Sequence, residues 1–297
     1  MKKLSLAFLI LTLALCSCLP RQCAEGTFSN SSPMCNVKKD QTFLPSHRIL
    51  PISSFVMIRS MVTFKPGKCI SYNKKKKKKK KCSKEDIKEG FDTLDKMRPV
   101  FRGSGIVMKV LNNKTYILTA KHVCTKEKKI KLTKKLSEKE PDILIEWDVE
   151  QTVTSSVMGQ DGIPRKSKAL IIHEKKDVCI MVSPGDWGVP VPIAKHGPEI
   201  GEKVFNIAAP LGIFEPGKTT LVFSGHASGI DSDGDAYFTI PARPGSSGSA
   251  VLNIRGEIVA VIFAANAVIE NFALAVPLKN IKEVEAELFN QIIKDSD

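Results

Sequence analysis

The sequence contains few aromatic residues and lacks the common motifs for binding phosphate and metal ions. Phenylalanine, tyrosine and tryptophan make up 6% of the 297 residues. They do not alternate with basic residues, so stacking on nucleic-acid bases is not indicated. The chain has no glycine-rich phosphate loop, no EF-hand pattern and no cysteine–histidine spacing of a zinc site. We therefore predict no cofactor, no metal ion and no specific nucleic-acid partner.

The formal net charge of +14 depends on one homopolymeric run. Lys74–Lys81 are eight consecutive lysines, and removing these eight charges from +14 leaves +6, an ordinary surplus. Because like charges repel, the run predicts a disordered loop over residues 69–82. Two interpretations stay open: attachment of Lys74–Lys81 to an anionic membrane surface, and a low-complexity expansion without function.

The N-terminus has the pattern of an export signal. Two lysines precede an apolar segment, residues 4–15, that is too short to span a membrane. We predict a signal peptide over residues 1–17, followed by a tether over residues 18–53 that is rich in Ser, Pro, Lys and Asn. The four residues ending at Cys18 resemble a bacterial lipobox, with Cys18 as the candidate lipidated residue. An ordinary signal peptide and an uncleaved anchor are the alternatives. The expected location is periplasmic or extracellular.

Three separate segments carry the residue types of nucleophilic catalysis. Ser247 lies in the glycine- and serine-rich segment 244–249, His122 follows a strand-like run, and Asp177 leads into an apolar run. A serine hydroxyl becomes a good nucleophile when an imidazole takes its proton and a carboxylate holds that imidazole. The chain order His, Asp, Ser is that of chymotrypsin-like enzymes. Together the segments predict the catalytic triad of a serine protease.

The backbone around the candidate nucleophile suits the same chemistry. A tetrahedral intermediate needs backbone N–H groups aimed at its oxyanion, and glycine lets the chain bend to aim them. We assign this oxyanion hole to the amides of Gly245 and Ser247. Taken alone, a segment of this composition is more often a flexible turn between strands. The apolar runs 250–252 and 258–262 favour a loop held by a strand pair.

The remaining histidines fit catalysis less well. His173 lies in a charged turn four residues before Asp177, and we predict that it is solvated. His196 and His226 stand beside glycine in loops.

The eight cysteines suit an oxidising compartment. Cys16 would leave with the signal and lipid would take Cys18, which leaves an even number. Cys124 and Cys179 each lie two residues after a candidate triad member, so they could meet behind the site. The other expected pairs are local in sequence: Cys23–Cys35 and Cys69–Cys82.

These segments form part of an ordered series of blocks. In chain order the blocks are Gly103-Ser104-Gly105-Ile106-Val107, Tyr116 to Val123, Ala169 to Ile180, Gly201 to Gly212 and Phe272 to Pro277. The series resembles the trypsin-like peptidases, and within them the Deg-type (HtrA-like) branch. The resemblance covers most of the chain from about Ser54 onward, without the C-terminal PDZ domain of that branch.

The resemblance implies an all-β fold with two antiparallel six-stranded β-barrels (chymotrypsin-like), a C-terminal helix and a site between the barrels. The expected bounds are about 54–190 for the first barrel, about 191–277 for the second and 278–294 for the helix. Short apolar strands and regular turn signals indicate the same class. The implied substrates are proteins or peptides. Proteases of this branch often trimerise, so the resemblance allows an oligomer. Nothing in the chain independently shows one.

Two positions depart from family patterns. Ser249 replaces the second glycine after the nucleophile, and Ser246 replaces the aspartate of digestive zymogens. Without that aspartate, activation through an ion pair with a new N-terminus is not expected.

Specificity rests on three residues. The position six before the nucleophile is Pro241, so no carboxylate is available there for a basic substrate side chain. Phe263 and Ala264 are expected to line the rest of the pocket. An apolar pocket predicts cleavage after small or medium apolar residues.

Three functions follow from these features. The leading one is an exported serine endopeptidase that works through an acyl-enzyme. The alternatives are a catalytically idle protease-fold protein that binds peptides, and a membrane-tethered polycationic binder.

Overall fold

The computed structural model describes residues 51–73, 78–84, 100–125, 129–135, 143–266 and 269–295. The predicted signal peptide, the tether, Cys18 and the Cys23–Cys35 pair lie outside these residues, as do Lys74–Lys77. In the described part of the chain, no helix is both long and apolar enough to cross a membrane.

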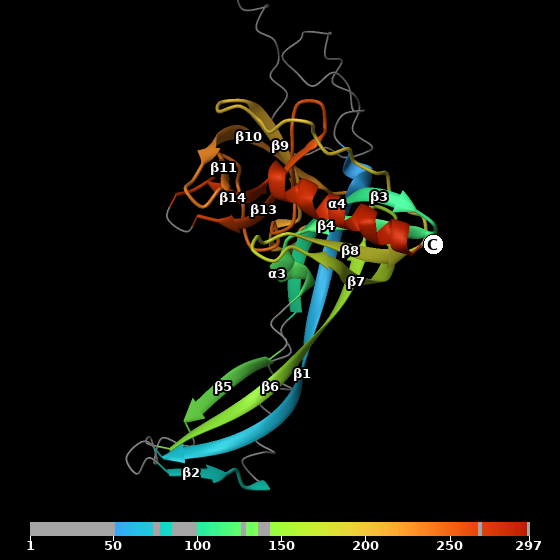
Figure 1. The fold of residues 1–297 in the computed structure, drawn as a ribbon. Helices are drawn as coiled ribbons and strands as arrows, with labels where there is room; N and C mark the ends of the chain where they lie inside the picture. Colours follow the sequence, from blue (N-terminus) through green and yellow to red (C-terminus); the bar gives the residue numbers. More distant parts are fainter. Residues whose placement is uncertain are drawn as a thin grey trace, which may run out of the picture.

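The first barrel consists of six antiparallel strands in the order β1-β3-β4-β8-β7-β6, closed by pairing between β1 and β6 (Figure 1). Its strands contain mostly buried residues where they enclose the core, as in β4 and β8. Their bounds are β1 (Phe55–Asn73), β3 (Val100–Leu111), β4 (Lys114–Thr119), β6 (Ile143–Met158), β7 (Pro164–Ile172) and β8 (Cys179–Pro184). A 3-10 turn, η1 (Ile52–Ser54), precedes β1, and a short helix, α3 (Lys121–Cys124), follows β4.

The second barrel also closes with six antiparallel strands, in the order β10-β11-β14-β13-β12-β9. Their bounds are β9 (Lys203–Ala208), β10 (Leu221–Ile230), β11 (Ala236–Phe238), β12 (Ala250–Leu252), β13 (Ile258–Ala265) and β14 (Ala273–Pro277). A 3-10 turn, η2 (Pro210–Gly212), follows β9, and helix α4 (Leu278–Lys294) follows β14. The predicted fold class, two six-stranded antiparallel barrels with a C-terminal helix, is confirmed.

One apolar core joins the two barrels and the helix. Leu118 from the first barrel, Leu252 from the second and Val284 from α4 belong to the same cluster of buried side chains, and each is fully buried. Ile281 and Leu288 extend this helix face, as their spacing predicts. Since burial of one such side chain contributes about 1.5–3 kcal/mol, this shared core holds the barrels in a defined orientation.

A β-arm projects from the first barrel (Figure 1). It is formed where β1 and β6 run on together and are flanked by β2 (Lys78–Lys81) and β5 (Lys129–Lys135). The disulfide between Cys69 and Cys82, predicted from the sequence, ties β1 to the end of β2.

The prediction of a disordered loop over residues 69–82 is wrong for the described part of that range. Lys78–Lys81 pair in register with Ile70–Asn73. Backbone hydrogen bonds and the disulfide order this segment, while Lys79, Lys80 and Lys81 keep exposed side chains in water. Charge repulsion between solvated ammonium groups is weak enough for this arrangement.

Candidate active site

His122 and Asp177 leave the first barrel at the same end. β4 and β8 are antiparallel neighbours, and Thr119 at the end of β4 pairs with Cys179 at the start of β8. His122 follows β4 within α3, and Asp177 precedes β8. The strand register therefore brings two residues that are 55 positions apart into contact.

Two hydrogen bonds join these residues. The Nδ1 atom of His122 lies 2.7 Å from Oδ2 of Asp177, and the backbone N–H of His122 donates to Oδ1 at 2.9 Å. Burial raises the pKa of the Asp177 carboxyl, but the hydrogen bonds and the charge interaction with His122 outweigh it and hold the pKa below its usual value. The carboxylate is therefore ionised at neutral pH and positions the imidazole.

A disulfide fixes the distance between the two segments. Cys124 and Cys179 are bonded, as predicted, which ties α3 directly to β8. Both residues are buried. The cross-link lies two residues beyond His122 on one side and two beyond Asp177 on the other.

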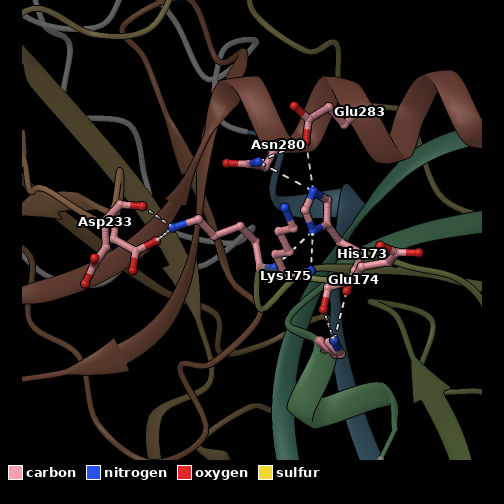
Figure 2. A network of polar contacts seen from close by, with 9 residues as sticks. His173, Glu174, Lys175, Asp233, Asn280 and Glu283 are labelled. Atoms are coloured by element: carbon pink, nitrogen blue, oxygen red, sulfur yellow. Dashed lines mark hydrogen bonds and ion pairs between the residues drawn. The ribbon is translucent and has the colours of Figure 1, made fainter.

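The turn before Asp177 is anchored by His173, contrary to the prediction that this histidine is solvated. Its side chain is 14% exposed, and Nε2 lies 2.8 Å from Oε2 of Glu283 on α4. Nδ1 accepts hydrogen bonds from the backbone N–H groups of Lys175 and Lys176. Figure 2 shows the imidazole between the helix and the turn. The sequence around His173 shows only charged neighbours, because its partner on α4, Glu283, lies 110 residues away along the chain.

Two lysines extend this network. The ammonium group of Lys176 donates to Oδ1 of Asp235 at 2.7 Å and to the carbonyl of Asp233 at 2.6 Å, in the turn between β10 and β11 (Figure 2). Lys121, directly before His122, donates to the carbonyl oxygens of His173 and Glu174. The turn that carries Asp177 is thus held by the second barrel and by the histidine segment.

The Ser247 loop packs against the histidine strand. The carbonyl of Ser247 accepts a 2.8 Å hydrogen bond from the N–H of Ser104 on β3. At Gly248, whose φ is +89°, a Cβ would overlap Thr119 Oγ1 and the carbonyl oxygen of Ser104. The loop therefore approaches the end of β4 at a distance that only glycine permits.

The hydroxyl of Ser247 donates to the carbonyl of Phe263 at 3.3 Å. No hydrogen bond between described residues joins it to the ring of His122. The structure thus brings His122 and Asp177 into direct contact and places Ser247 on the adjoining loop with its hydroxyl turned toward β13.

The two predicted oxyanion amides stand out in this loop. The N–H groups of Ser246, Gly248 and Ser249 donate to backbone carbonyls. Among the described residues, no hydrogen bond occupies the N–H groups of Gly245 and Ser247. Their assignment to an oxyanion hole stays a prediction.

Gly245 has a backbone geometry that other residues would not tolerate. Its φ is +100°, and a Cβ would lie 2.5 Å from the carbonyl oxygen of Ala209. The carbonyl of Pro244 accepts a 2.6 Å hydrogen bond from Leu211 N–H. Because the peptide is trans, the N–H of Gly245 points away from Leu211.

The departure at Ser249 has a local compensation. Ser249 is fully buried, and the side-chain amide of Asn206 on β9 donates to its Oγ at 2.8 Å and to the carbonyl of Ala250 at 2.9 Å. The extra hydroxyl thus has a partner in the core. At Ser246, Oγ accepts a hydrogen bond from Arg243 N–H and closes the turn before the nucleophile.

The three predicted pocket residues are all half-buried. Of them, only Phe263 forms a hydrogen bond with Ser247 in the structure, through its carbonyl. That Pro241 and Ala264 line a specificity pocket stays a prediction.

Sequence reasoning assigned no role to Ser104, Thr119 or Asn206. All three are fully buried polar residues at the junction of the nucleophile loop with the barrels. The available signal was a polar residue inside an apolar strand, as in Gly103-Ser104-Gly105. Among the described residues, no group of three or more histidine, cysteine or acidic side chains could hold a metal ion.

Two closed six-stranded barrels, with a His–Asp pair on the first and a serine loop from the second that is hydrogen-bonded to β3 of the first, define a chymotrypsin-like architecture. The family model for the trypsin-like peptidase domain matches residues 103–261. The chain belongs to the trypsin-like peptidase family.

The chain is also similar to curated proteins described as serine protease HtrA-like. It is 27% identical to one from Staphylococcus haemolyticus over 200 residues, which is 63% of this chain and 28% of the relative. It is 25% identical to one from Staphylococcus aureus over 201 residues, 63% of this chain and 23% of the relative. The chain spans less than a third of the length of these relatives.

Among solved structures, the serine endoprotease from Yersinia pestis aligns with a TM-score of 0.51 at 18% identity. The alignment covers 81% of this chain and 64% of that one. At this identity the likeness concerns the fold alone.

Proposed function

We propose that this protein is an exported serine endopeptidase that cleaves peptide bonds through an acyl-enzyme. His122 is the general base and acid, Asp177 orients it, and Ser247 is the nucleophile. The observation that carries the proposal is the contact of His122 with an ionised Asp177 beside the Ser247 loop. With the proton of His122 on Nδ1, facing Asp177, Nε2 keeps its lone pair for a proton from serine.

The proposed reaction has two steps, acylation of Ser247 and hydrolysis of the acyl-enzyme. The Ser247 hydroxyl turns from Phe263 to His122, gives its proton to Nε2, and Oγ attacks the peptide carbonyl. The N–H groups of Gly245 and Ser247 stabilise the resulting oxyanion. When the C–N bond breaks, the imidazolium protonates the leaving amine. In the second step, water gives a proton to Nε2 of His122 and attacks the ester carbonyl. The imidazolium then returns the proton to Oγ of Ser247, which releases the carboxylic acid product and the free serine.

The disulfides support the compartment that we propose. Two disulfides in the described residues indicate an oxidising compartment. We propose export by the signal over residues 1–17 to a periplasmic or extracellular location, with lipidation of Cys18 as the anchor. For the apolar pocket of Pro241, Phe263 and Ala264, we propose cleavage after small or medium apolar residues.

A fluorophosphonate probe tests the proposal. It should label the purified wild-type chain, while Ser247→Ala should show no labelling because the nucleophile is gone. Ser224→Ala, a half-buried serine on β10 away from the loop, is the matched control and should label like wild type. Labelling that persists in Ser247→Ala, or no labelling of wild type, would contradict the proposal.

A second function, attachment to an anionic membrane surface, is favoured by the charge of the arm. Residues 64–84 contain eleven lysines and no acidic residue, so this segment carries a large share of the chain's net charge of +14. β2 places Lys79, Lys80 and Lys81 on the exposed edge of the arm. Each lysine near an anionic leaflet contributes about 1 kcal/mol to binding at low salt.

Sedimentation with vesicles tests this attachment. Phosphatidylglycerol vesicles should bind the protein in a salt-sensitive way and phosphatidylcholine vesicles should not. The triple variant Lys79→Gln, Lys80→Gln and Lys81→Gln should bind more weakly. The matched control replaces three exposed lysines of the barrel, Lys114, Lys166 and Lys168, with glutamine. Equal loss in both triple variants would refute a role specific to the arm.

A further inference from the structure

Ser104 is a buried residue that forms hydrogen bonds with the Ser247 loop, with the end of β4 before His122 and with Ala209 after β9. It lies on β3 with no exposed surface. Its N–H donates to the carbonyl of Ser247 at 2.8 Å, and its carbonyl accepts a 2.7 Å hydrogen bond from Thr119 Oγ1, three residues before His122. Its backbone thus links the nucleophile loop with the histidine strand.

The side chain of Ser104 makes two further hydrogen bonds. Oγ donates to the carbonyl of Gly245 at 2.8 Å and accepts from the N–H of Ala209 at 3.0 Å. A residue of the first barrel therefore joins the oxyanion loop to the end of β9 in the second barrel. Both partners are buried backbone groups, so the hydroxyl satisfies a donor and an acceptor that water does not reach.

The contact matters because of where the Gly245–Ser246 peptide lies. It is the peptide between the two candidate oxyanion amides, those of Gly245 and Ser247. Leu211 N–H holds the carbonyl on one side of Gly245, and Ser104 Oγ holds the carbonyl on the other. Without a Cβ, glycine rotates readily between positive and negative φ, so these two hydrogen bonds keep its φ at +100°.

We propose that Ser104 is a positioning residue for the oxyanion hole: its hydroxyl fixes the Gly245–Ser246 peptide so that both amides point at the same oxygen. The inference rests on the proposed peptidase function. It goes beyond the triad, because it makes the competence of the second barrel depend on a side chain of the first. Loss of the hydroxyl leaves Ser247, His122 and Asp177 in place and misdirects the amides.

The test compares Ser104→Ala with a control of equal burial and hydrogen bonding. Thr115 on β4 is fully buried, and its hydroxyl also donates to a carbonyl (Gly185, 2.8 Å) and accepts from an amide (Trp187, 3.1 Å). Thr115→Ala therefore reports the general loss of a buried hydroxyl in the same barrel. Thermal unfolding shows that each variant folds.

The readout is the saturation kinetics of fluorophosphonate labelling. We expect Ser104→Ala to lower the maximal labelling rate toward the loss of about 10²–10³-fold that follows removal of one oxyanion donor, with the half-saturating probe concentration unchanged. Ser104→Cys, of similar size with a weak donor, should fall between Ser104→Ala and wild type. Thr115→Ala should label at the wild-type rate.

Each result decides one question. A wild-type rate in Ser104→Ala, or an equal loss of rate in Thr115→Ala, would overturn the role of Ser104 and leave the proposed peptidase standing. If only the half-saturating concentration rises, Ser104 shapes probe binding and the inference is wrong. No labelling of wild type would overturn the peptidase proposal itself, and with it this role.

Discussion

The close approach of the nucleophile loop to the histidine strand can be tested at one glycine. In Gly248→Ala the new Cβ would overlap Thr119 Oγ1 and the Ser104 carbonyl and lie 3.0 Å from Ala120 N. These are backbone or buried atoms that cannot swing aside. The left-handed φ of +89° adds about 1–2 kcal/mol of strain for alanine, and the forced shift of a packed core adds about 1–3 kcal/mol. We therefore expect Gly248→Ala to lower the free energy of unfolding by about 2–5 kcal/mol.

Two other glycines separate the contributions. Gly234 has a φ of +80° with open space around it, so Gly234→Ala should cost only the strain, about 1–2 kcal/mol. Gly197 has open space and no left-handed φ, so Gly197→Ala should be neutral or stabilise by about 0.4–1 kcal/mol.

Thermal and urea unfolding measure the three variants. For a domain of this size, Gly248→Ala should lower Tm by about 4–20 °C, more than Gly234→Ala. If the two variants unfold alike, the loop does not pack against Thr119 and Ser104 as the structure has it, and the account of the site is refuted.

Two further predictions concern the His–Asp segment. Asp177→Asn should slow fluorophosphonate labelling about 10⁴-fold, because an amide selects the wrong tautomer of the imidazole. Folding lowers the pKa of Asp177, so its carboxylate contributes fully to stability above the unfolded pKa, about 3.9. This contribution is lost as the pH falls through the lower folded pKa. In urea unfolding across this acid range, the free energy of unfolding should therefore fall less steeply with pH in Asp177→Asn than in wild type. Replacing Cys124 and Cys179 together with alanine should cost about 2–5 kcal/mol and slow labelling, whereas opening Cys69–Cys82 in the arm should leave the labelling rate unchanged.

The sequence was sufficient for features that depend on local motifs. His122 and Asp177 adjoin apolar runs that became neighbouring strands, and the register of β4 and β8 then required their contact. The same register explains why the pairing of Cys124 with Cys179 could be inferred from their positions relative to the triad candidates.

Features that depend on distant partners could not be read in advance. His173 looked solvated because its neighbours are charged, yet it is held by Glu283 on α4. The lysine run looked disordered because repulsion is visible in the sequence, whereas the pairing of Lys78–Lys81 with β1 is not. Ser104 attracted no role because its partner, Gly245, lies 141 residues further along the chain.

In the proposed mechanism, His122 activates Ser247, and Ser247 then forms an acyl-enzyme. A p-nitrophenyl ester mixed with enzyme in stoichiometric amounts should give a burst of p-nitrophenol, and mass spectrometry of the quenched protein should find the acyl group on Ser247. The burst should vanish in His122→Ala. Release of p-nitrophenol without an acyl group on Ser247, or an equally fast burst in His122→Ala, would contradict the account.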